Sequence, residues 1–240
     1  MAGHSHWAGI KHKKGRQDKE RSKIFSKLSR EITVAAKLGA KDPETNPRLR
    51  TAIQAAKQSN MPKDNIERAI NKSSNNQSEN YQSLRYEGFG PFNVAFIIEA
   101  LTDNKNRTAS KLRTIFQKNN GRLGETGSTA HLFFSCGVIL INRKDLLEEE
   151  IFDIAINSGA KDCNTYDKFH EIICKKDDFY KVKTLIEKKI ENIIYTGIEW
   201  RANNYLNVSR EKIDIIKKIF NSLEDEDDVQ KVFLNCKIDL

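Results

Sequence analysis

The polar stretch 73–82 limits the possible folds more than any other feature, because the sequence pattern changes there. Before it, apolar residues recur every three or four positions, the spacing of one face of an α-helix. After it, short apolar runs typical of strands alternate with helical segments. The stretch itself, SSNNQSENYQ, has the composition of a linker. We therefore expect a helical N-terminal domain followed by α/β domains.

Three helices are predicted in the N-terminal part. The first covers about 17–38, where the apolar positions form one continuous face. The second begins at Pro47 with Asn46 as its N-cap, since each residue type is preferred at that position. Pro62 opens the third, and residues 1–15 have no periodicity and are expected to form a flexible arm. Short helices joined by tight loops predict a small bundle.

The α/β part divides into a central series and two flanking pieces. The central series has the order β-α-β-β-α-β, and the flanking pieces together supply β-α-β twice. The economical interpretation is one ferredoxin-like domain inserted into another. The central strands are predicted at 137–141, 163–166, 169–174 and 192–200, with helices at 146–158 and 177–189; the flanking pieces have extended segments at 93–101, 122–134, 205–208 and 229–234, with helices at 105–119 and 210–223.

The predicted fold class is therefore α+β and multidomain. A three-helix N-terminal domain is followed by two ferredoxin-like α/β domains, of which the third is inserted into the second. The predicted domains are 1–75 for the basic helical domain with its arm, 80–134 plus 202–240 for the second domain, and 135–201 for the inserted domain.

The basic residues are concentrated in the first third of the chain. Residues 1–72 contain 17 Lys and Arg against 7 Asp and Glu, whereas residues 73–240 contain 24 against 26. The formal net charge of +8 therefore arises wholly from the N-terminal part. Clustered cations raise the local positive potential, which favours a polyanionic partner. The sequence thus predicts that the N-terminal domain binds nucleic acid through phosphate contacts.

Part of this charge forms a stripe on the first helix. Arg16, Lys19, Lys23, Lys27 and Arg30 follow one another at steps of three or four residues, opposite the apolar face. A solvated helix face is the ordinary alternative; an anionic membrane surface is a weaker one, since the apolar face has a single aromatic residue. The candidate nucleic-acid-binding residues are Lys11, Lys13, Lys14, Arg16, Lys19, Lys23, Lys27, Arg30, Arg48 and Arg50.

The arm also carries His4, His6 and His12 close to Trp7. A His-x-His pair can bind a metal ion, but no carboxylate or cysteine nearby completes a site. Stacking on bases and hydrogen bonding to bases or sugars is the favoured interpretation. No metal site is predicted.

Two further motifs have an ordinary structural interpretation beside a functional one. The glycine spacing from Gly121 to Gly127 resembles a phosphate loop, but it lacks the Lys-Ser/Thr ending and leads into a strand, so a turn is expected. The acidic run Glu224–Asp228 is expected to be a solvated turn between a helix and a strand. Binding of a divalent ion and docking on the basic domain are its alternatives.

The sequence shows no catalytic constellation, so we predict no enzymatic activity, no catalytic residues and no cofactor. The cysteines, which form no C-x-x-C pair, are expected to be incidental thiols in a reducing cytosol. No apolar run reaches the roughly 18 residues of a membrane span, and no signal-peptide core precedes the first helix. We therefore expect a cytoplasmic protein without a membrane or small-molecule partner.

Six blocks of sequence are distinctive, and they are spread over essentially the whole chain: MAGHSHWAGIKHKKGRQDKERSKIFSKLSREITVAAKLGAKDP, NPRLRTAI, MPKDNIERAI, YEGFGP, DNKNRT and DVQKVF. They resemble the YebC/PmpR family of bacterial probable transcriptional regulatory proteins. The resemblance implies a cytoplasmic three-domain protein that binds DNA and controls transcription. Similar mitochondrial proteins act as translational activators. Two departures are visible: Gly9 stands where Asn is common, and Phe92-Asn93 replaces a usual Gly pair.

The favoured function is that of a DNA-binding transcriptional regulator acting through its basic N-terminal domain. The alternative is an RNA- or ribosome-associated translation factor, a translational activator. An enzyme or scaffold that merely carries a basic domain is the third class. No helix has Asn, Gln or Arg placed at its N-terminus to read base edges, which favours phosphate- or shape-directed binding. The choice between DNA and RNA, the target sequence and the oligomeric state are left open.

Overall fold

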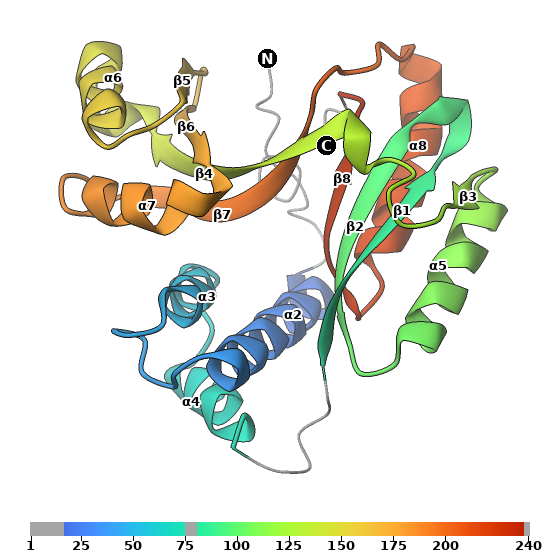
Figure 1. Cartoon of the computed structure of the whole chain (residues 1–240), viewed down its shortest axis with the longest axis horizontal. Coiled ribbons are helices and arrows are strands. Elements are labelled where there is room, and N and C mark those ends of the chain that lie inside the picture. The colour runs from blue at the N-terminus through green and yellow to red at the C-terminus, as the bar shows by residue number, and fades with distance from the viewer. Residues whose placement is uncertain (1–16, 75–80, 238–240) are drawn as a thin grey trace. The chain divides into compact units, whose positions relative to one another are not determined.

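The computed structural model describes residues 17–74 and 81–237, and Figure 1 shows its helices and strands. The described residues form two compact units: residues 133–203 make one, and the described residues before and after them make the other. The fold is α+β, as predicted, with two four-stranded sheets. The sequence predictions for the arm, including those for His4, His6, Trp7 and Gly9, lie outside the described residues.

The N-terminal domain consists of the predicted bundle. Its helices are α2 (Gln17–Leu38), α3 (Pro47–Gln58) and α4 (Lys63–Lys72). Asn46 joins α2 to α3: its side-chain oxygen accepts from the Leu49 N–H at 3.1 Å, and its amide donates to the Ala35 carbonyl at 2.9 Å. The predicted N-cap therefore also satisfies a carbonyl of the preceding helix. The buried core contains Ile32, Ala35, Ala36, Leu49, Ala52, Ala56, Met61, Ile66 and Ala69.

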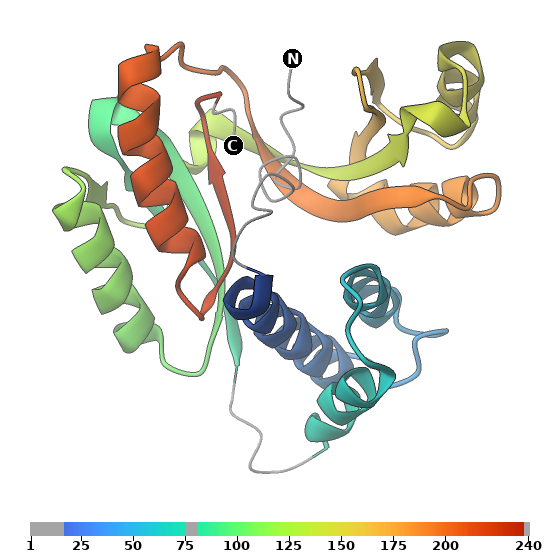
Figure 2. The same cartoon turned by 180° about the vertical axis from the view of Figure 1, so that it is seen from behind.

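The first sheet, here called the outer sheet, has the strand order β3-β1-β2-β8, with every pair antiparallel. Helices α5 and α8 lie on one face of it (Figure 2). Phe96 of β2 and Phe116 of α5 meet edge to face in its core, with their ring centroids 5.7 Å apart. The elements are β1 (Gln82–Phe89), β2 (Ala95–Thr102), α5 (Lys105–Lys118), β3 (Arg122–Leu123), α8 (Arg210–Glu224) and β8 (Val229–Leu234).

The outer sheet differs from the prediction at two strands. The predicted strand 205–208 is wrong, since Leu206 forms only an isolated bridge to Cys236. Its place in the ferredoxin-like order is taken by β1, where no strand was predicted; only Gln82 of β1 belongs to the predicted linker 73–82. β1 pairs with β2 along its whole length, from Gln82 opposite Thr102 to Phe89 opposite Ala95. Only residues 122–123 of the predicted segment 122–134 join this sheet as β3.

The second sheet, here called the inserted sheet, has the order β5-β6-β4-β7 and lies between β3 and α8 in the sequence. This is the ferredoxin-like arrangement that the β-α-β-β-α-β series predicts. Helices α6 and α7 bury Ile151, Ala155, Val182 and Ile186 against it. The elements are β4 (Phe133–Asn142), α6 (Glu148–Asn157), β5 (Asp162–Thr165), β6 (Phe169–Lys175), α7 (Phe179–Glu187) and β7 (Ile193–Ala202).

Short 3-10 helices join several of these elements: η1 (Pro91–Asn93), η2 (Ala130–Leu132), η3 (Arg143–Asp145) and η4 (Lys176–Asp178). In η1, Phe92 and Asn93 have φ angles of 61° and 60°. Glycine adopts this left-handed conformation without steric cost, whereas phenylalanine does not. Phe92 is therefore held in a strained backbone conformation at this turn.

Candidate nucleic-acid interface

Three residues of the predicted basic stripe face the acidic run within the second unit. The Lys23 ammonium lies 3.0 Å from the Asp225 carboxylate, and the Lys27 ammonium lies 3.2 Å from the Glu224 carboxylate. Lys27 also donates to the Glu224 carbonyl at 2.9 Å. These cations lie on successive turns of α2, so one short segment meets a whole face of the helix.

Arg30 completes this contact. Its guanidinium lies 3.3 Å from the Asp228 carboxylate and donates to the carbonyls of Asp227 and Leu101. The Arg30 and Asp228 side chains are 16% and 6% exposed, whereas those of Lys23 and Asp225 are 31% and 62% exposed. The contact is therefore buried at Arg30 and open to solvent at Asp225.

The acidic run is also held by its own domain. Asp228 accepts from the Arg107 guanidinium at 2.9 Å and from the Thr108 hydroxyl at 2.8 Å. Burial alone raises the pKa of Asp228, but these hydrogen bonds and the charges of Arg107 and Arg30 hold it below its usual value. The hydrogen bond from Lys111 to Glu226 raises the Lys111 pKa. The interpretation as a solvated turn is thus wrong for Asp228, and docking on the basic domain is what the structure shows.

The remaining candidate residues have different surroundings. Arg48 makes a two-point ion pair with Glu31, at 2.8 and 3.2 Å, and Arg50 donates to the carbonyls of Pro43 and Glu44, both at 3.1 Å. Lys19 belongs to α2, but its side chain lies outside the described residues, as do Lys11, Lys13, Lys14 and Arg16. The structure therefore brings Lys23, Lys27 and Arg30 together on the acidic run, whereas Arg48 and Arg50 bond within the helical domain.

Two of the distinctive sequence blocks meet at Asp228. DNKNRT supplies Asp103, Arg107 and Thr108, and DVQKVF begins with Asp228 itself. Arg107 bridges the Asp103 and Asp228 carboxylates at 2.7 and 2.9 Å. No pattern in the sequence predicted this network; the signal that pointed to its residues was the distinctive character of the two blocks.

The glycine-rich turn binds an internal carboxylate. Glu87 of β1 is 1% exposed and accepts from the backbone N–H groups of Gly127, Thr129 and Ala130, at 3.0, 2.8 and 2.8 Å. Burial by itself raises the pKa of Glu87, but these N–H groups and the Arg85 charge lower it overall. The N–H groups that a phosphate loop would offer to a ligand are thus used by the protein itself.

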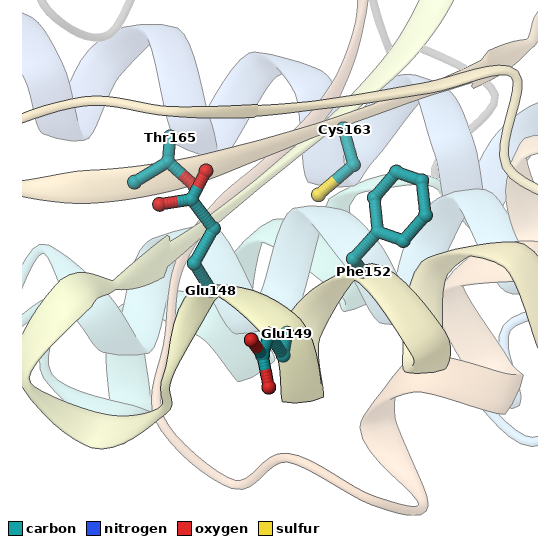
Figure 3. A pocket seen from close by; sticks show the side chains of 5 residues that line it. All are labelled: Glu148, Glu149, Phe152, Cys163 and Thr165. Atoms are coloured by element: carbon teal, nitrogen blue, oxygen red, sulfur yellow. The ribbon is translucent and has the colours of Figure 1, made fainter.

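The inserted domain has an open cavity of about 390 Å³ beside α6. Figure 3 shows its lining: Glu148, Glu149 and Phe152 from α6, and Cys163 and Thr165 from β5. Burial, assisted by the charges of Asp162 and Glu148, raises the pKa of Cys163 to about 11. The thiol is therefore protonated near neutral pH, which makes it a poor nucleophile.

The described residues also bear on metal binding and on membrane insertion. In residues 17–74 and 81–237, no group of three or more His, Cys, Asp or Glu side chains is placed to hold a metal ion. Within the same ranges, no helix has the length and apolar character needed to span a membrane. Cys136, Cys163, Cys174 and Cys236 are free thiols.

Comparison with known proteins gives consistent matches over nearly the whole chain. Residues 5–76 match the family described as the TACO1/YebC protein N-terminal domain, and residues 81–236 match the TACO1/YebC second and third domain. A protein of Pelagibacter ubique, named a probable transcriptional regulatory protein, is 58% identical over 235 residues, which cover 98% of each chain. The crystal structure of a conserved hypothetical protein from Aquifex aeolicus is similar at a TM-score of 0.87 and 43% identity, covering 98% of this chain and 97% of that one.

Proposed function

Because the chain belongs to the TACO1/YebC family, we propose that it is a DNA-binding transcriptional regulator that acts in the cytoplasm through its N-terminal domain. The Pelagibacter relative carries the name of a probable transcriptional regulatory protein. The observation that carries the proposal for this chain is the excess of 17 Lys and Arg over 7 Asp and Glu in residues 1–72. Such an excess attracts a polyanion, and each phosphate contact releases condensed counterions.

The proposed mode of binding is directed by phosphates. Positions 19, 23, 27 and 30 of the long helix α2 follow one another at steps of four, four and three residues, so these basic positions share one face of the helix. Lysine and arginine on such a face fix the position of a duplex without reading its sequence. The arm residues Lys11, Lys13 and Lys14 add to the same charge. Base-specific contacts would then make a smaller contribution than in a regulator with a dedicated recognition helix.

The proposal includes no catalytic step and no cofactor. Two observations support the proposed absence of catalysis and of a phosphate-bearing cofactor. Burial keeps the Cys163 thiol protonated, which makes it a poor nucleophile. The N–H groups of the glycine-rich loop, which would suit a phosphate, are bonded to Glu87. Four free thiols also suit a reducing compartment, which supports the cytoplasmic location.

The proposal is tested with the full chain and a labelled DNA duplex. Changing Lys11, Lys13, Lys14 and Lys19 to Gln should weaken binding at least about tenfold at moderate salt, and the slope of log affinity against log salt should become shallower by about 0.9 for each phosphate that is no longer bound. The matched control removes the same charge from the inserted domain by changing Lys144, Lys168, Lys181 and Lys188, which are exposed, to Gln. An equal weakening in both proteins would refute a specific role for the N-terminal domain.

The nature of the polynucleotide needs its own measurement. The protein is crosslinked to nucleic acid in cells, and the attached molecules are sequenced. Enrichment of DNA fragments over RNA supports transcriptional regulation. Recovery of mainly ribosomal or messenger RNA would overturn the DNA assignment and indicate action in translation.

A further inference from the structure

We propose that the acidic run, residues 224–228, is an internal competitor for nucleic acid on the basic face of α2. In this arrangement a polynucleotide reaches Lys23, Lys27 and Arg30 only by displacing the run. The inference concerns the regulation of the proposed site and rests on the proposed function. It is carried by the contacts of these three cations, by their burial and by the second set of partners that the acidic run possesses.

The acidic run supplies carboxylate and carbonyl oxygens as partners for Lys23, Lys27 and Arg30, as a polyanion would. Carboxylates of Asp225, Glu224 and Asp228 pair with Lys23, Lys27 and Arg30 in that order. Carbonyl oxygens of the same segment accept further hydrogen bonds from the three cations. The face is therefore occupied by anionic and polar oxygens, the same kind of acceptor that a phosphate backbone offers.

Occupation also removes the face from solvent. The side chains of Lys27 and Arg30 are 17% and 16% exposed, and those of Glu224 and Asp228 are 11% and 6% exposed. Oxygens of a phosphate backbone cannot approach these two cations while the pairs persist. Binding by the complete stripe thus requires the pairs to separate.

When these ion pairs separate, no buried carboxylate of the acidic run is left without a hydrogen-bond partner, because Asp228 and Glu224 have other donors. Asp228 keeps the Arg107 guanidinium and the Thr108 hydroxyl. Glu224 keeps the backbone N–H of Val232, at 3.1 Å from its second carboxylate oxygen. An unpaired buried charge would make release very costly. Phosphate can therefore replace the acidic run as the partner of Lys27 and Arg30. The Asp228 and Glu224 carboxylates then keep their hydrogen bonds to Arg107, Thr108 and the Val232 N–H.

The exposed end is where displacement would begin. Asp225 is 62% exposed and pairs with Lys23 alone among the contacts that the structure gives for its carboxylate. Exposed pairs contribute little to stability and are screened by salt. A polynucleotide already held by other cations of the N-terminal domain would thus meet Lys23 first and then Lys27 and Arg30.

The test neutralises the competitor without touching the basic face. In the full chain, Glu224→Gln and Asp225→Asn are combined, and binding of a labelled DNA duplex and of an RNA duplex of equal length is measured. The amide oxygen that Glu224→Gln introduces can still accept from the Val232 N–H, so the local fold is maintained. Affinity for the bound probe should rise at least about fivefold at moderate salt, because two competing charges are removed.

The matched control is Glu211→Gln with Asp214→Asn, which changes net charge equally and lies near the other end of α8, at exposed positions. This control should raise affinity by less than about twofold, since it brings only the general gain in charge. A rise no larger than in the control, or a fall, would overturn the competition and leave the contact as a purely structural interface.

A second variant guards against misfolding of the first. Asp225→Lys places a cation opposite Lys23 at an exposed position, so the core is untouched; Asp214→Lys is its control. The first should bind more tightly than the second by at least about threefold, and equal affinities would contradict the inference. Failure of the wild-type protein to bind either probe would overturn the proposed function, whereas tight wild-type binding with no gain in these variants would overturn only the competition.

Discussion

At the scale of single residues, Glu87 shows how one buried carboxylate fixes a loop. The segment from Gly124 to Ala130, which includes the second half of the glycine-rich turn, has few apolar side chains to pack. Its order comes from N–H groups that converge on Glu87, together with the Gly124 N–H that donates to the Glu87 carbonyl at 2.8 Å. Hydrogen bonds to a charged acceptor are stronger than neutral ones, which explains why burial of this charge is tolerated.

Replacing Glu87 by Gln should therefore lower the free energy of unfolding by about 2 kcal/mol at pH 7, because charged acceptors contribute roughly 1.5–3 kcal/mol per bond and the amide supplies one acceptor oxygen. Urea unfolding measures the change. Glu125→Gln is the control, since this carboxylate belongs to the same turn but is exposed. A destabilisation as large in the control as in Glu87→Gln would contradict the role of the buried charge.

The stability difference between the wild-type protein and Glu87→Gln should also depend on pH. Glu87 has a folded-state pKa below its usual value of 4.5, so its stabilisation is complete above that pH and is lost as the pH falls through the lower folded pKa. The difference in unfolding free energy between wild type and Glu87→Gln should shrink over this acidic range, because a protonated carboxyl resembles the amide. A difference that stays constant down to a pH of about 2.5 would show that the carboxylate charge contributes nothing.

At the scale of elements, close packing of α7 on β4 depends on a glycine. A Cβ added to Gly137 would lie 2.5 Å from Cδ2 of Phe179 and 2.6 Å from Sγ of Cys174. Both of these side chains are fully buried, so neither has space to move away. The helix can approach the strand this closely only because position 137 has no side chain.

Gly137→Ala should consequently destabilise the inserted domain by roughly 1–3 kcal/mol, the usual effect of overpacking a core. Thermal or denaturant unfolding measures it, with Ser135→Ala in the same strand as the control. Adding Phe179→Leu to Gly137→Ala should cost less than the two single changes summed, since the smaller side chain makes room. Strict additivity would refute the steric explanation.

At the scale of the whole molecule, the two ends of the inserted segment lie close together. Phe133 at the start of β4 lies opposite Ala202 at the end of β7. Partner residues of antiparallel strands are only about 5 Å apart. All strands of the outer sheet, β1, β2, β3 and β8, are encoded outside this segment.

Deletion of residues 133–203, with Leu132 joined to Asn204 through a short Gly-Ser linker, should leave a protein that unfolds cooperatively. The reason is that all strands of the outer sheet and both of its helices remain. Circular dichroism followed during urea unfolding tests this. Absence of a cooperative transition would show that the outer domain depends on the inserted one for its stability.

The sequence by itself determined the elements whose signals are local. The period of residues 17–38, the Asn46-Pro47 cap and the β-α-β-β-α-β order all depend on neighbouring positions, and the structure confirms them. The concentration of positive charge in residues 1–72 is also a property of the sequence alone. The distinctive sequence blocks correctly indicated the family.

The tertiary structure decided what depends on partners far apart in the chain. β1 pairs with β2 and β3 on its two sides, whereas no strand was predicted at residues 82–89 from their own pattern. Lys27 and Arg30 face Glu224 and Asp228, which lie 197 and 198 positions further along the sequence, so their occupation could not be inferred from the helical pattern. Helical periodicity shows which side of a helix is charged, but only folding brings the opposing carboxylates to it.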